Sequence, residues 1–111
     1  MKKIVALVLC LVLAAVSLFA FAEGESDKAY VAAKGKLLVG ITDFEPMDYK
    51  DADGNWTGFD AELALAFGDY LGVAVEFQEI DWDNKILELN SKTIDCVWNG
   101  MTLTEEVVAA M

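Results

Sequence analysis

The sequence contains no histidine, and its eight basic residues are all lysines, against 19 acidic residues. Without histidine, the side chain most often used for proton transfer is missing, and any general acid–base chemistry falls to carboxylates. The formal net charge of −11 argues against a nucleic-acid partner, because too few cations are present to neutralise phosphates. An acidic surface of this kind indicates solubility and says little about the fold.

Cysteine is also scarce, with Cys10 and Cys96 alone. Two cysteines form neither a disulfide framework nor a zinc-ligand pattern, and we expect no metal and no cofactor. Cys10 lies in the middle of a hydrophobic run without the small neighbours of a lipid-anchored cysteine. Cys96 lies in a short apolar segment, which predicts a buried free thiol.

The first 22 residues have the parts of a secretory signal peptide. Lys2 and Lys3 precede an apolar run from Ile4 to Val16, and the small-x-small sequence Ala20-Phe21-Ala22 follows. A transmembrane anchor is the alternative, since about 19 apolar residues could just span a bilayer. The position of the small residues favours cleavage after Ala22 and a periplasmic or extracellular chain.

Strand and helix patterns alternate after a polar leader. Residues 23–35, EGESDKAYVAAKG, are small and charged and predict a flexible leader. Short apolar or alternating runs predict strands over 36–41, 73–80 and 93–99. A 3.6-residue period predicts helices over 60–72, over 83–92 and from residue 104 onward.

A hairpin is predicted between the first strand and the first helix, with Tyr49 and Trp56 on either side of the turn DADGN. This turn has its glycine at the fourth position, whereas a calcium-binding EF-hand loop needs glycine at the sixth. We therefore expect a solvated turn and no metal there.

The apolar spacing also predicts which helical side chains are buried. The first helix carries one apolar stripe, formed by Leu63, Phe67, Tyr70 and Leu71. The second helix should bury Ile86 and Leu87, with Asp81 or Asp83 as its cap. Trp98, inside the third strand, is expected in the core.

Strands that alternate with helices through short connections predict an α/β fold with a parallel sheet. In such sheets the ligand crevice lies beyond the carboxyl ends of the strands. This rule selects three loops as candidate binding segments, residues 43–45, 81–83 and 99–102. Three strands also make an incomplete sheet, which would need further strands to cover its core.

Three stretches together resemble a known family. GFDAELALAFGDYLG, at residues 58–72, resembles the signature of the polar amino-acid class of bacterial extracellular solute-binding proteins, the receptors of ABC importers. LLVGITDFEPMDYKDADGNWTGFD resembles the first strand, binding loop and hairpin of that family. VEFQEIDWDNKILELNSKTIDCVWNGMTLTEE resembles the stretch that ends in its ligand-binding threonine loop. The resemblance spans about residues 36–106, with the landmarks in order and at matched spacing.

The resemblance implies a fold of two α/β lobes that close over one solute. Residues 36–111 would then be an incomplete first lobe, with a parallel-sheet core flanked by helices, truncated before the second lobe. The expected function is that of a secreted binding component that delivers an amino acid or similar small polar solute to ABC permease membrane subunits. No enzymatic activity is expected from this resemblance.

The family pattern also implies ligand-binding positions in the three loops. They are Asp43, Phe44, Trp82, Asn99, Gly100, Met101 and Thr102. Asp43 would approach the ligand ammonium, Trp82 would form an aromatic wall, and Gly100 and Thr102 would offer backbone N–H groups and a hydroxyl. Structural explanations compete, because Asp43 could form a turn and Trp82 could belong to the core.

The start of the last helix has two interpretations and one departure from the family. Thr102 and Glu105 have the spacing of a capping box, in which Thr102 would cap the helix. Most relatives carry an arginine that grips the ligand carboxylate with two hydrogen bonds, and Val107 stands at that position here. The carboxylate would have to rely on the helix start, on the backbone of residues 100–102, or on the second lobe.

An enzyme on the same fold is the alternative function, either a periplasmic dehydratase or the binding-like lobe of a lytic transglycosylase. General acid–base work would require a positioned carboxylate. The candidates are Asp43, Glu45, Asp81, Asp83, Glu105 and Glu106. Carboxylates at helix starts are usually solvated, which favours the binding protein.

Overall fold

The computed structural model describes residues 26–111. The predicted signal peptide, its cleavage site after Ala22 and residues 23–25 lie outside this range. No helix in the described range is long and apolar enough to cross a bilayer. Within the same range, no three His, Cys, Asp or Glu side chains form a group able to hold a metal ion.

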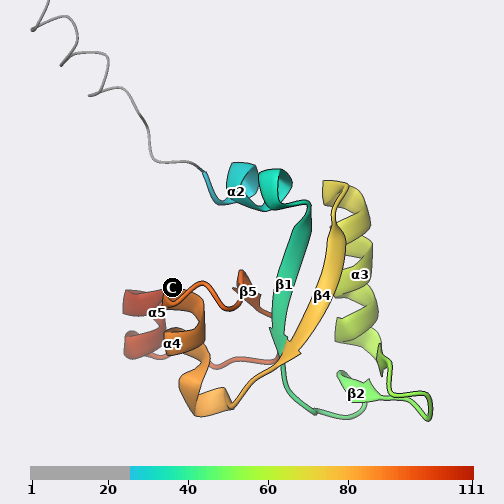
Figure 1. Cartoon of the computed structure of the whole chain (residues 1–111). Coiled ribbons are helices and arrows are strands. Elements are labelled where there is room, and N and C mark those ends of the chain that lie inside the picture. The colour runs from blue at the N-terminus through green and yellow to red at the C-terminus, as the bar shows by residue number, and fades with distance from the viewer. Residues whose placement is uncertain (1–25) are drawn as a thin grey trace, which may run out of the picture. The chain divides into compact units, whose positions relative to one another are not determined.

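The structure contains a three-stranded parallel sheet (Figure 1). Strand β1 (Lys36–Ile41) lies between β4 (Ala74–Glu79) and β5 (Cys96–Val97), and it pairs in parallel with both. The side chains of Leu37, Val39 and Ile41 are buried, as the unbroken apolar run predicts for a central strand. The predicted α/β fold with a parallel sheet is confirmed.

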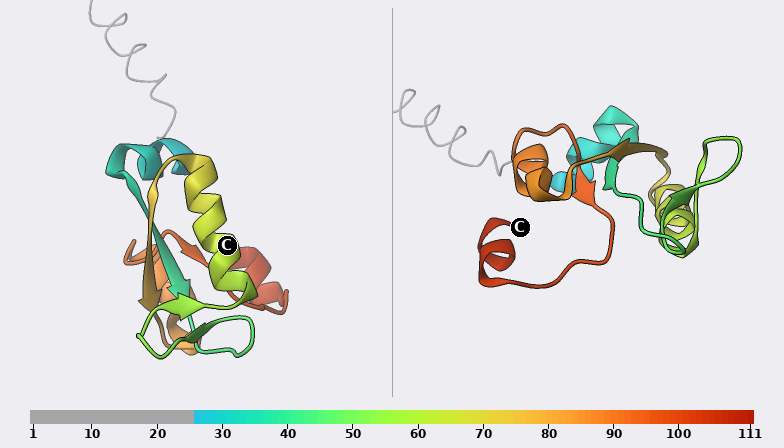
Figure 2. Two further views of the ribbon diagram at one scale, coloured as in Figure 1. Left: turned by 90° about the vertical axis from the view of Figure 1, so that its right-hand side faces the viewer. Right: turned by 90° about the horizontal axis from the view of Figure 1, so that it is seen from below.

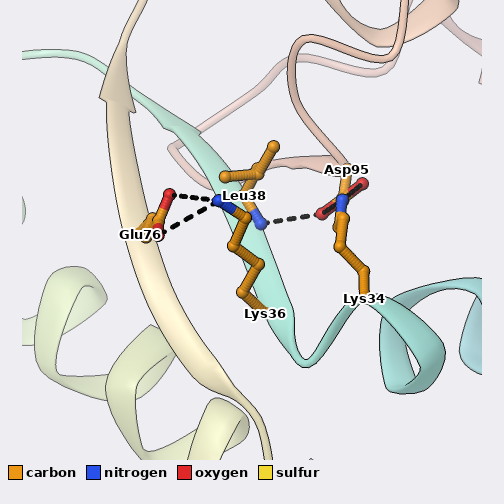
Figure 3. Close-up of polar contacts among 5 residues, drawn as sticks. All are labelled: Lys34, Lys36, Leu38, Glu76 and Asp95. Carbon is orange, nitrogen blue, oxygen red and sulfur yellow. Dashed lines mark hydrogen bonds and ion pairs between the residues drawn. The ribbon is translucent and has the colours of Figure 1, made fainter.

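Strand β5 is shorter than the predicted strand 93–99, because a side chain replaces part of the ladder. The Asp95 carboxylate accepts the Leu38 N–H at 2.8 Å and pairs with the Lys34 ammonium at 2.6 Å. On the other side of β1, Lys36 pairs with Glu76 of β4 at 3.1 Å (Figure 3). The Asp95 side chain thus holds the segment before β5 against β1 in place of a regular backbone hydrogen bond.

The hairpin forms as predicted between β2 (Tyr49–Lys50) and β3 (Trp56–Thr57). In the turn, one Asp51 oxygen accepts the N–H groups of Asp53 and Asn55, each at 2.9 Å. The turn is therefore stabilised by its own aspartate.

A helix occupies most of the segment predicted as a flexible leader. Helix α2 (Asp27–Lys34) contains the alanine-rich sequence AYVAAK, and the Ser26 hydroxyl accepts the Ala29 N–H at 3.2 Å. Asp27 in the first turn and Lys34 in the last complement the helix dipole. These local features outweigh the polar composition from which the leader was inferred.

Helix α3 (Phe59–Leu71) ends at Gly72, which adopts the left-handed conformation expected of a C-terminal cap. The prediction of its buried face is wrong. The buried residues are Ala61, Ala64 and Gly68, whereas Leu63 is 50% and Tyr70 85% exposed. The physical reason is close approach to the sheet, since a Cβ at Gly68 would lie 2.3 Å from Val75 Cγ2.

The predicted helix 83–92 is divided into a 3₁₀ turn, η1 (Trp82–Asn84), and helix α4 (Lys85–Asn90). Asp81 caps η1, as predicted, by accepting the Asp83 N–H at 3.0 Å. Leu87 is 65% exposed, contrary to the prediction, whereas Ile86 and Leu89 of the same helix are half-buried. Trp98 is half-buried and lies 5.6 Å from the Phe67 ring.

The last helix, α5 (Glu105–Ala110), begins two residues later than the predicted capping box requires. Thr104 is the cap, and its hydroxyl accepts the Val107 N–H at 3.2 Å. The prediction that Thr102 caps this helix is therefore wrong. Thr102 is exposed in the connection from β5 to α5, where its hydroxyl makes no hydrogen bond to another described residue.

Candidate functional site

The loops that follow the three parallel strands lie at one end of the sheet, where the hairpin is also found (Figure 1). The Asn99 side-chain amide donates to the Thr42 hydroxyl, which joins the loop after β5 to the loop after β1. Gly100 also lies beside Phe44, because a Cβ added to Gly100 would be 3.7 Å from Phe44 Cε1. The predicted meeting of these loops is thus present in the structure.

A cavity of about 270 Å³ lies at this end. Its walls come from η1, from α4 and α5, and from the long connection between β5 and α5 that Figure 2 shows. The lining residues are Trp82, Lys85, Ile86, Gly100, Met101, Thr102, Thr104, Glu106 and Val107. Four of the seven predicted binding residues, Trp82, Gly100, Met101 and Thr102, therefore line one cavity.

Trp82 and Lys85 form one structural unit in the wall. The Lys85 ammonium lies 4.7 Å from the centroid of the Trp82 ring, and it donates a hydrogen bond to the Trp82 carbonyl at 3.1 Å. Residues three positions apart in a helical turn face the same side, which explains why the two side chains meet. The cation–π contact fixes an ammonium group at the cavity wall.

The loop after β5 is held by its own asparagine. The Asn99 side-chain oxygen accepts the Gly100 N–H at 2.7 Å, while the amide nitrogen of the same side chain reaches Thr42. Met101 is half-buried in the cavity wall. Asn99 is therefore adjacent to the cavity and orients the glycine that lines it.

Asp43 and Phe44 do not line this cavity. Asp43 is exposed, and Phe44 is 54% exposed at the start of a turn. That turn is closed by two backbone hydrogen bonds between Phe44 and Asp48, at 2.6 and 3.0 Å. Of these two predicted residues, Phe44 lies next to the site, because its ring is close to Gly100.

Asp48, which the sequence analysis did not select, is fully buried. Neither of its carboxylate oxygens has a hydrogen-bond partner among the described residues. Burial, and then the nearby charge of Asp60, raises the Asp48 pKa to about 6. Nothing in the pattern of the sequence distinguishes this aspartate from the many exposed ones.

Five lining residues were also not predicted as ligand contacts: Lys85, Ile86, Thr104, Glu106 and Val107. Lys85 could have been predicted, because it lies three residues after Trp82 and therefore faces the same side of the helical turn. Lys85 and Glu106 are the charged members of the lining, and no ion pair joins them among the described residues. Val107, at the position expected for arginine, is buried.

Residues 37–109 match the family described as bacterial extracellular solute-binding proteins, family 3. The arginine-binding extracellular protein ArtP of Bacillus subtilis is 39% identical over 99 residues, which cover 88% of this chain and 38% of ArtP. The L-cystine-binding protein TcyJ of Escherichia coli is 36% identical over 77 residues, 68% of this chain and 29% of TcyJ. The chain thus spans less than half the length of these relatives.

Solved structures show the same fold. An ancestral cationic amino-acid solute-binding protein, AncCDT-1, matches with a TM-score of 0.70 and 41% identity over 76% of this chain and 37% of its own. The arginine-bound form of domain 1 from TmArgBP matches with a TM-score of 0.66 and 38% identity over 72% of this chain and 64% of that domain. The cyclohexadienyl dehydratase of Pseudomonas aeruginosa is more distant, at 24% identity over 106 residues, 95% of this chain and 39% of the enzyme.

Proposed function

We propose that this chain, which belongs to family 3 of the bacterial extracellular solute-binding proteins, binds an amino acid outside the cytoplasm for an ABC importer. Residues 36–111 would supply part of the first lobe, and closure of a second lobe would enclose the solute. The predicted signal peptide, cleaved after Ala22, would carry the chain across the membrane. The permease subunits of the importer would be its partners.

The observation that carries this proposal is the cavity at the carboxyl ends of the strands. It combines an aromatic wall, Trp82, with the glycine and threonine of the loop after β5. Small-molecule sites usually place a few polar groups so that they converge on the ligand, and here threonine, lysine and glutamate side chains accompany the aromatic wall. ArtP and TcyJ, whose names specify arginine and cystine, point to an amino acid as the solute.

Each predicted residue has a role in this site. Trp82 packs against the ligand, and Gly100 to Thr102 form the floor with backbone groups and the free Thr102 hydroxyl. Asn99 holds the floor in place through Gly100 and Thr42. Asp43 and Phe44 lie on the neighbouring loop, from which they would reach a ligand held between two lobes.

Calorimetric titration with the protein L-amino acids and L-cystine tests the proposal, using the protein expressed from its complete reading frame. Trp82→Ala should weaken binding by about tenfold or more and remove the ligand-dependent change in tryptophan fluorescence. Trp56→Phe is the matched control, because Trp56 lies on the hairpin and does not line the cavity. Absence of amino-acid binding by the parent protein would contradict the function, and full binding by Trp82→Ala would contradict the site.

A dehydratase is the second candidate, and one observation favours it. The cyclohexadienyl dehydratase resembles 95% of this chain, and the residues that line the cavity include a glutamate, Glu106, and a lysine, Lys85. Such a pair could exchange protons with a substrate. Incubation with a cyclohexadienyl acid, followed by the ultraviolet absorbance of an aromatic product, should show no conversion if the binding function is correct.

A further inference from the structure

If the cavity encloses the carboxylate of a ligand, the protein must supply a positive partner for it, because an unpaired buried charge is costly. The sequence offers lysine alone for this purpose, since it contains neither arginine nor histidine. Three lysines of the described residues are already paired with carboxylates: Lys34, Lys36 and Lys50. Lys85 is the lysine that lines the cavity, and no carboxylate of the described residues lies within ion-pair distance of it.

The geometry of Lys85 leaves it able to bind an anion. An ammonium group has three N–H donors and no acceptor. One donor is used on the Trp82 carbonyl at 3.1 Å, which leaves two. The Trp82 ring, 4.7 Å from the nitrogen, holds the charge in place, so little side-chain entropy remains to be lost on binding.

The second charge of the cavity defines the kind of anion. Glu106 lines the same space from α5, without an ion pair to Lys85. One cation and one anion that do not neutralise each other match the two charges of a zwitterion. A ligand with a carboxylate alone would be repelled by Glu106, which argues against a simple organic acid.

We propose that Lys85 is the group that binds the α-carboxylate of the ligand, and that Glu106 favours a ligand that also carries an ammonium. This inference rests on the proposed amino-acid-binding function. The ligand carboxylate would therefore bind to a residue of helix α4. Val107 of helix α5, at the position where the family has arginine, is buried and supplies no positive charge. The ligand class is therefore free α-amino acids with an unblocked carboxylate.

The test compares an acid with its amide. The tightest binder among the protein L-amino acids and L-cystine is titrated into the parent protein and into Lys85→Met, together with the C-terminal amide of the same amino acid. Lys85→Met should weaken binding of the amino acid by roughly 10- to 100-fold, the range of one charge-assisted hydrogen bond. Binding of the amide, which has no carboxylate, should stay within about twofold of the parent, since most of its contacts are unchanged.

Lys50→Met is the matched control. The Lys50 ammonium also lies over a tryptophan, 5.0 Å from the Trp56 ring centroid, but on the hairpin outside the cavity lining. Lys50→Met removes the same charge and the same type of cation–π contact. It should leave the affinities for the amino acid and for its amide unchanged. If Lys85→Met fails to fold by circular dichroism, Lys85→Gln replaces it, because glutamine is neutral and keeps a hydrogen-bond donor.

The outcomes separate the two proposals. Equal loss of acid and amide binding, or no loss of either, overturns the role of Lys85 and leaves the amino-acid-binding function standing. Loss of affinity for the acid alone supports it. If the parent binds no amino acid of the panel, the proposed function fails, and the assignment of Lys85 fails with it.

Discussion

Among single residues, Asp48 has the least favourable surroundings. It follows the turn that carries Phe44, it is fully buried, and both carboxylate oxygens lack partners among the described residues. Burial and the Asp60 charge raise its pKa from 3.8 to about 6. A raised folded-state pKa means that the native state holds the proton more tightly than the unfolded chain does.

The penalty for the charged Asp48 is fully present above about pH 6 and disappears as the pH falls towards 4, where the unfolded chain is also protonated. Asp48→Asn removes the charge and should raise the free energy of unfolding at pH 7.5 by roughly 1–2 kcal/mol. Urea denaturation at pH 7.5 and 4.5 measures this difference, which should be much smaller at the lower pH.

Asp53→Asn is the control for this comparison. It makes the same change of charge in the exposed turn of the neighbouring hairpin, so it should give a small difference that does not vary with pH. If Asp48→Asn destabilises the protein equally at both pH values, Asp48 is stabilised in its charged form and the interpretation is wrong.

The residues of the candidate site were predictable only in part. The loops that carry Trp82 and Gly100 could be selected because the carboxyl ends of parallel strands lie at one edge of the sheet, and the resemblance to the family then implied these two residues. Lys85 and Glu106 could not, because charged residues at helix starts usually face solvent, and only the fold shows which of them face a cavity. Asp48 illustrates the same limit, since burial of an aspartate depends on the loop that covers it.

At the scale of elements, helix α3 shows where apolar spacing gives the wrong face. Leu63, Phe67 and Tyr70 form a regular stripe, but the helix packs on β4 and β1 through small residues. Gly68 permits the closest approach, because a Cβ there would meet Val75 Cγ2 at 2.3 Å and the Val73 carbonyl oxygen at 3.2 Å. The size of side chains, rather than their hydrophobicity, selects the face that meets the sheet.

Gly68→Ala tests this explanation. Alanine favours a helix over glycine by about 1 kcal/mol, so helix propensity alone predicts a more stable protein. Overpacking against β4 should outweigh that gain and lower the free energy of unfolding by about 1–2 kcal/mol in urea denaturation. In a Val75→Ala background the same substitution should be neutral or stabilising, because the obstructing methyl group is gone. Stabilisation by Gly68→Ala alone would show that the helix can move away from the sheet.

Element types were predictable, and their ends were less so. The strand at 36–41 was placed to the residue because its apolar run is bounded by lysine on one side and polar loop residues on the other. The ends of β5 and α5 depend on Asp95 and Thr104, whose side chains take over backbone hydrogen bonds. The Asp95 contact joins residues far apart in the sequence and has no signature in local spacing. The Thr104 cap is local, but Thr102 and Thr104 are both candidates for it in the sequence.

At the scale of the whole molecule, the alternation of strands and helices was enough to predict a parallel sheet and the edge at which the loops meet. It could not predict how much apolar surface the described residues leave uncovered. Large apolar side chains on several elements are exposed, including Tyr70 of α3, Leu87 of α4 and Val108 of α5. A sheet of three strands also has two unpaired edges within the described residues.

Residues 23–111 expressed alone should therefore melt with poor cooperativity and bind a dye that detects apolar surface, such as anilinonaphthalene sulfonate. The physical reason is that a small domain with exposed large side chains and open sheet edges buries too little surface to offset its conformational entropy. Calorimetry and dye fluorescence measure both properties, with domain 1 from TmArgBP, of which this chain matches 64%, as the control expected to melt sharply. A sharp two-state transition without dye binding would show instead that β1, its two neighbours and α3 already form a sufficient core.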